Sequence, residues 1–79
     1  MAVYFIRQVG TNLIKVGWAK EPTERMKTLQ TGSPHAFELL AVGDGGAREE
    51  HALHRRFAEA HVRGEWFRMS GDIALAIAL

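Results

Sequence analysis

The chain has 79 residues, which predicts one domain with a small hydrophobic core. It has no cysteine, which excludes disulfides and thiolate metal sites and fits a reducing, cytoplasmic setting. The formal net charge of +1 is too small to drive nucleic-acid binding by bulk electrostatics, so such binding would need a local basic patch.

Two strands joined by a tight turn are the first predicted elements. Ala2–Gln8 is rich in β-branched and aromatic residues and apolar on both alternating sets, which indicates a strand covered on both faces. Residues 12–18 alternate between apolar and other residues and predict a second strand. Gly10-Thr11 suits the centre of the turn, with glycine first.

This turn predicts the register of the hairpin. Ile6 is expected opposite Lys15, and Tyr4 opposite Gly17. Tyr4 and Lys15 then lie on one face as diagonal neighbours. A slip of one residue would move them to opposite faces, so their proximity depends on the turn.

A helix is predicted next. Pro22 begins it at the N1 position that proline favours. Met26 and Leu29 are expected to form its buried stripe, with Arg25 beside Met26 on the same side.

Gly32 and Pro34 end this helix and lead into a third strand. Residues 36–42 alternate in the manner of a strand. The glycine-rich residues 43–46 predict a flexible turn, in which Asp44 could cap the helix that follows.

A long helix is predicted from about residue 48 to Arg63, with Gly64 at the C′ position. Its apolar stripe consists of Leu53, Phe57 and Ala60. Glu50 lies on or beside this stripe, where an unpaired carboxylate is costly. His54, four residues later, projects from the same face.

The end of the chain carries a second unusual carboxylate and a last helix. Glu65 stands between Gly64 and the aromatic pair Trp66 and Phe67. Ser70 could cap a short helix over residues 71–79. Neither the apolar run at residues 2–6 nor this apolar tail is long enough for a signal peptide or a membrane span, so no membrane partner is expected.

The order of elements predicts one α/β (α+β) domain over residues 1–79. Its sheet is expected to have three mostly antiparallel strands flanked by helices. Five polar residues lean inward in this arrangement: Tyr4, Lys15, Arg25, Glu50 and His54. Each alone has a simple structural explanation, such as a core tyrosine or a lysine that reaches solvent. Together they are hard to explain by stability in so small a core.

Other charged groups allow alternatives. Arg55, Arg56 and Arg63 could form a solvated helix face with ion pairs, or a patch for nucleic acid. A zinc site built on histidines lacks cysteine and a well-placed third ligand, which makes it a weak prediction.

Several motifs together resemble the GIY-YIG endonuclease superfamily, and most closely its phage-borne branch, usually described as a DNA-binding domain. In order they are Tyr4-Phe5-Ile6, Lys15-Val16-Gly17, Arg25, Leu29-Gln30-Thr31-Gly32-Ser33-Pro34, Glu50-His51-Ala52-Leu53-His54-Arg55-Arg56-Phe57 and Gly64-Glu65-Trp66-Phe67. We expect structural roles for Gly17, Gly32, Pro34, Phe57, Gly64, Glu65, Trp66 and Phe67. The resemblance extends from Val3 to about Phe67.

The resemblance implies cleavage of DNA phosphodiester bonds with one divalent ion, Mg²⁺ or Mn²⁺. The metal ligand falls on Glu50, and the catalytic tyrosine and arginine fall on Tyr4 and Arg25. Tyr4 could accept a proton from water if a cation such as Lys15 lowered its pKa. His54 completes the predicted catalytic group.

The sequence also departs from the superfamily pattern. Val3 replaces the first glycine, Lys15 replaces the second tyrosine, and no asparagine follows Glu65. A lone module of this size would need a homodimer or a partner DNA-binding protein for useful DNA affinity. Two alternatives are a non-cleaving module that binds nucleic acid through its arginines, and an interaction module that uses Trp66 and Phe67.

Overall fold

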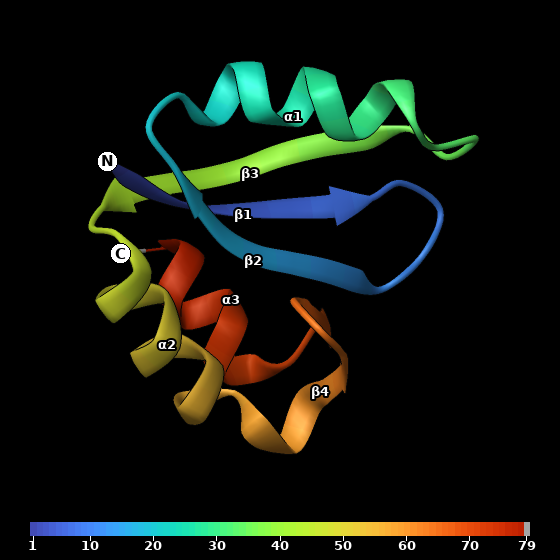
Figure 1. Ribbon diagram of the computed structural model, residues 1–79. Helices are drawn as coiled ribbons and strands as arrows, with labels where there is room; N and C mark the ends of the chain where they lie inside the picture. The colour runs from blue at the N-terminus through green and yellow to red at the C-terminus, as the bar shows by residue number, and fades with distance from the viewer. Residues whose placement is uncertain (79) are drawn as a thin grey trace.

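The computed structural model describes residues 1–78 and confirms the α+β class. Its elements are β1 (Ala2–Gln8), β2 (Leu13–Ala19), α1 (Pro22–Thr31), β3 (Phe37–Asp44), α2 (Ala47–Arg56), the 3₁₀ turn η1 (Ala58–Ala60), β4 (His61–Arg63), β5 (Trp66–Arg68) and α3 (Gly71–Ala78). The sheet order is β3-β1-β2-β5-β4, and all the pairings are antiparallel. Helix α1 lies on one side of the sheet, and α2 and α3 lie together on the other (Figure 1).

The main core lies between the sheet and the pair α2 and α3. Its buried members are Val3, Phe5, Ile14, Val16, Phe57, Phe67 and Ile73. Phe57, just after α2, meets Phe5 and Phe67 edge to face, with ring centroids 6.3 and 6.2 Å apart. Full burial of one such side chain stabilises the fold by about 1.5–3 kcal/mol, so Phe57 fixes the end of α2 against the sheet.

The predicted register of the first hairpin is confirmed. Tyr4 pairs with Gly17, and Ile6 pairs with Lys15. Gly10 in the turn has φ +84°, which explains why glycine is favoured there. Tyr4 and Lys15 therefore share the face of the sheet that α1 covers.

The prediction of three strands and one long helix is wrong at residues 57–68. Helix α2 ends at Arg56, and the chain turns through η1 into the β4–β5 hairpin. Gly64, with φ +55°, lies in the turn of this hairpin rather than after a helix. A helix end and a hairpin turn both favour a glycine with positive φ, so Gly64 alone does not distinguish them. The pairing of β5 with β2 selects the hairpin.

The turn between α1 and β3 is held by one side chain. The Gln30 amide donates to the His35 carbonyl (2.7 Å), and its oxygen accepts from the Phe37 backbone N–H (2.8 Å). Gly32 caps α1 as predicted, and Pro34 lies in the turn. Gln30 thus joins the end of the helix to the start of the strand.

The predicted cap on α2 is wrong, whereas the cap on α3 is confirmed. Asp44 belongs to the longer strand β3, and the helix begins after Gly46, whose N–H donates to Glu49 Oε1 (2.8 Å). Ser70 Oγ accepts from the Ile73 N–H (3.2 Å) at the start of α3. The last residue of the helix predicted over 71–79 lies outside the described residues.

The helices of residues 1–78 are all too short or too polar to cross a membrane.

Candidate active site

Tyr4 lies over Gly17 near the middle of the sheet. Tyr4 is only 1% exposed. A Cβ atom on Gly17 would lie 2.6 Å from Tyr4 Cζ and 2.8 Å from Glu65 Oε1, which is closer than non-bonded atoms pack. The missing side chain therefore lets the Tyr4 hydroxyl group and the Glu65 carboxylate meet above β2.

The last hairpin places Glu65 at this position. The Glu65 carbonyl accepts a hydrogen bond from the Val16 N–H (2.9 Å), which ties the hairpin to β2. Glu65 Oε1 lies 3.3 Å from Lys15 Nζ. The Lys15 ammonium also lies over the Trp66 ring, 5.3 Å from its centroid. Lys15 is therefore fixed by two neighbours inside the site.

Helix α2 brings Glu50 and His54 to the same edge of β2. His54 Nε2 donates to the Val16 carbonyl (2.8 Å) and lies 3.6 Å from Glu50 Oε1. The His54 ring also meets Phe67 edge on, with centroids 4.9 Å apart. His54 thus fastens α2 to the sheet, and the Glu50 side chain is held largely out of solvent.

Tyr4 holds its proton tightly in this environment. Burial raises the pKa of Tyr4 above that of an ordinary phenol, and the negative charges of Glu65 and Glu50 raise it further. Arg25, on α1, lies close enough to the Tyr4 hydroxyl group to act in the opposite direction and lower that pKa. Lys15, the cation expected to lower the pKa of Tyr4, is paired with Glu65, and its effect on Tyr4 stays a prediction.

Glu50 is also perturbed. Burial raises the pKa of Glu50 above the usual range, and repulsion from Glu65 adds to this effect. The positive charges of His54, His51 and Lys15 partly offset it. Glu65 therefore lies close enough to Glu50 for its negative charge to oppose the ionisation of Glu50.

The donor set fits a hard divalent cation. Glu50 and Glu65 offer carboxylate oxygens, and their repulsion would be relieved by a bound positive charge. Within residues 1–78 no group of three or more acidic or histidine side chains is arranged to hold a metal alone. Water and substrate phosphate oxygens would have to complete the ligand shell, as is common for Mg²⁺.

Comparison with known proteins identifies the family. The T5orf172 domain family model matches residues 1–78. The chain belongs to the T5orf172 domain family. This family is phage-associated and related to endonucleases, and membership in it suggests a nuclease-like or DNA-binding module with DNA as the partner. No curated protein and no solved structure gives a significant match.

The T5orf172 domain thus brings the five predicted inward polar residues together. Tyr4, Lys15, Glu50 and His54 meet along β2, and Arg25 approaches from α1. The site draws on both sides of the sheet, because Glu50 and His54 reach it past the end of β5.

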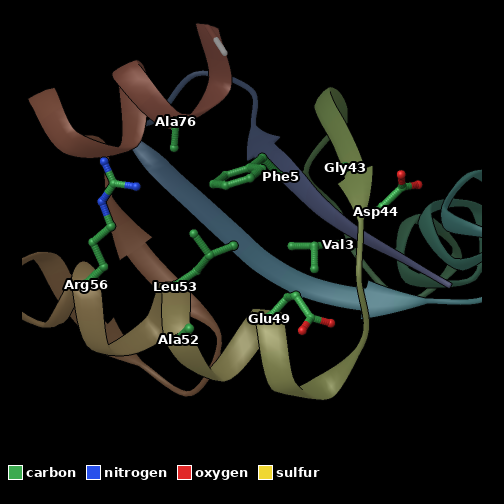
Figure 2. Close-up of a pocket in the computed structure, with 9 residues that line it drawn as sticks. All are labelled: Val3, Phe5, Gly43, Asp44, Glu49, Ala52, Leu53, Arg56 and Ala76. Carbon is green, nitrogen blue, oxygen red and sulfur yellow. The ribbon is translucent and has the colours of Figure 1, made fainter.

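The predicted nucleic-acid-binding arginines do not all lie beside this site. Arg56 is stacked on Phe57, with Cζ 5.7 Å from the ring centroid. Figure 2 shows it extending toward α3, at the rim of a hollow of about 450 Å³ with Val3 and Phe5 at its base. Glu49 lines the same hollow, which is mainly apolar and does not include Tyr4. Arg63 is exposed on β4.

Glu65 is the member of the site that the sequence-based prediction missed, since it was expected to be structural only. A carboxylate between glycine and two large aromatic residues was a visible signal. Its meaning depended on the pairing of β5 with β2, which brings Glu65 beside Lys15.

Proposed function

We propose that the chain is a GIY-YIG-like endonuclease that hydrolyses DNA phosphodiester bonds with one divalent metal ion, Mg²⁺ or Mn²⁺. The observation that carries the proposal is the convergence of Arg25, Glu50 and Glu65 on Tyr4, with Tyr4 and Glu65 meeting above Gly17. Stability alone does not favour two partly buried carboxylates that repel each other beside a buried phenol.

Each residue has a role suited to its chemistry. Glu50 would hold the metal ion, with Glu65 close enough to share it or to bind one of its water ligands. The metal ion would supply a Lewis acid for the phosphate and lower the pKa of a bound water molecule. Arg25 can hold a phosphate oxygen through paired N–H donors and stabilise the negative charge that develops there.

The roles of Tyr4 and His54 follow from their surroundings. A bound cation that neutralised Glu50 and Glu65 would remove the two charges that raise the pKa of Tyr4, so that more of Tyr4 would be ionised and able to accept a proton from the attacking water. His54 uses Nε2 to hold the Val16 carbonyl, which makes it a positioning residue for Glu50.

The test is cleavage of plasmid DNA with Mg²⁺ or Mn²⁺ by the wild type and two matched variants. Glu50→Gln should lose cleavage by about 100-fold or more, because the metal ligand loses its charge. Glu49→Gln, the neighbouring substitution on the same helix, keeps an oxygen for the Gly46 N–H and should cleave normally. Failure of the purified wild type to cut with either metal would refute the proposal.

The second candidate is a module that binds DNA without cutting it. Its support is Lys15, which stands where the superfamily has its second tyrosine and is paired with Glu65. This candidate predicts DNA binding that weakens with salt and survives Glu50→Gln, with no cleavage by the wild type. For either candidate, a homodimer or a separate DNA-binding protein would add the affinity that one small domain lacks.

The third alternative, a protein-interaction module, is not supported. Phe67 is fully buried in the core, so the expected exposed surface with Trp66 does not exist. Trp66 is half-buried and packs against Phe37, with ring centroids 5.9 Å apart.

A further inference from the structure

A pocket of about 310 Å³ lies on the outer flank of α2, next to the candidate active site. Its lining is His51, His54, Arg55, Ala58, His61 and Phe67. His54 belongs to both places, because its Nε2 atom lies 3.6 Å from Glu50 Oε1. The pocket is therefore one imidazole ring away from the proposed metal ligand.

Two aromatic walls of the pocket are held in place. His54 donates from Nε2 to the Val16 carbonyl, and His61 donates from Nε2 to the Gly64 carbonyl, both at 2.8 Å. Both rings pack against Phe67, with centroids 4.9 and 5.1 Å from it. The two rings are thus pre-organised by three elements, α2, β4 and β5.

The hydrogen-bonding pattern indicates which kind of ligand suits the pocket. Nε2 of each ring is taken up by its carbonyl partner, whereas Nδ1 makes no hydrogen bond within residues 1–78 and is open to a ligand. A phosphate group has no flat face to stack on the two fixed rings. A nucleobase offers N–H donors, acceptors and a flat face for stacking, and Arg55 adds a planar cation at the rim.

We infer that this pocket binds an unpaired nucleobase of a DNA strand whose phosphate lies at the candidate active site. The inference deepens the proposed function by naming single-stranded or locally opened DNA as the substrate class, and it rests on that function for the choice of DNA. Base stacking on aromatic side chains is largely independent of sequence, so the pocket gives a preference for unpaired strands rather than for a sequence.

The test measures binding without metal ions, in the presence of a chelator, so that it does not depend on cleavage. A short single-stranded oligonucleotide is compared with a strand of the same length made only of abasic deoxyribose phosphates. The wild type should bind the strand with bases about five- to 100-fold more tightly. His61→Ala and Arg55→Ala should lose most of this preference.

Arg56→Ala is the matched control, because Arg56 is the adjacent arginine and extends toward α3 on another face of α2 (Figure 2). It should weaken the binding of both strands equally and keep the preference for bases. Arg55 is exposed, so Arg55→Ala tests the pocket even if His61→Ala unfolds the hairpin.

Equal binding of the two strands by the wild type would overturn the inference, as would an unchanged preference in Arg55→Ala. Either result leaves metal-dependent cleavage, and hence the proposed function, untouched. Conversely, if the protein prefers the strand with bases but never cleaves DNA, the endonuclease proposal is refuted and the inference that the pocket binds a nucleobase is retained.

Discussion

At the scale of single residues, the site depends on one absent side chain and on one unusually placed tyrosine. Gly17 has an ordinary extended backbone, so its importance is steric and not conformational. The space it leaves holds the Tyr4 hydroxyl group and Glu65 Oε1. Gly17 can be tested by stability and cleavage measurements, and Tyr4 by titration.

Gly17→Ala should abolish cleavage and destabilise the domain by about 1–3 kcal/mol, because the added methyl group forces Tyr4 and Glu65 apart. Gly43→Ala is the control, since a Cβ atom there meets nothing within 4 Å. Chemical denaturation and plasmid cleavage measure the two effects. Full cleavage by Gly17→Ala would contradict the placement of Tyr4 in the reaction.

Tyr4 is the only tyrosine of the chain, so its ionisation can be followed directly by ultraviolet absorbance. The titration midpoint of the folded wild type should lie above that of a free phenol, chiefly because of burial and secondly because of Glu65. Glu65→Gln should lower this midpoint, and so should Mg²⁺ added to the wild type. A midpoint indifferent to both would argue against a shared site.

At the scale of elements, α2 is joined to the sheet by His54, where the short strand β5 leaves the Val16 carbonyl free to accept from it. This contact holds the part of α2 that carries Glu50 beside the sheet. The hairpin β4–β5 contributes from the other side by placing Glu65.

His54→Ala should destabilise the domain by about 1–3 kcal/mol, because it leaves the Val16 carbonyl unpaired and removes a ring from Phe67. Metal affinity should fall, whereas the pH profile of the remaining cleavage should keep its shape, since a positioning residue transfers no proton. His35→Ala, at an exposed histidine in the turn between α1 and β3, serves as the control. A lost limb in the pH profile would instead make His54 a catalytic acid or base.

At the scale of the whole molecule, the site lowers the stability of the fold at neutral pH. The pKa of Glu50 is raised in the folded state, by burial first and by Glu65 second. Protonated Glu50 therefore makes its full contribution to the free energy of unfolding below the pKa that Glu50 has in the unfolded chain. This contribution is lost as the pH rises through the pKa of Glu50 in the folded state.

Glu50→Gln should therefore melt at a higher temperature than the wild type at about pH 8, and the difference should disappear toward about pH 4, where glutamates protonate. Mg²⁺ should raise the melting temperature of the wild type but not that of Glu50→Gln. Thermal melts with and without the ion measure both effects. A variant that is less stable than the wild type at about pH 8 would show that Glu50 is an ordinary structural carboxylate.

The sequence predicted local features well and long-range pairings poorly. The register that places Tyr4 opposite Gly17 follows from the tight turn at Gly10-Thr11, and the structure confirms it. The segment around Phe57 and Gly64 satisfies both a helix and a hairpin, and only β5 docking on β2 distinguishes them. For this reason the sequence alone predicts only a structural role for Glu65, whereas its place beside Lys15 depends on that docking.

The dependence of the site on β5 has a consequence for the newly made protein. Tyr4, Lys15 and Arg25 emerge early from the ribosome, but Glu65 joins them only after α2 and the last hairpin have been synthesised and have docked. A nascent or truncated chain that ends before β4 lacks one of the two carboxylates. Such a chain would lack the complete site that the proposed cleavage requires.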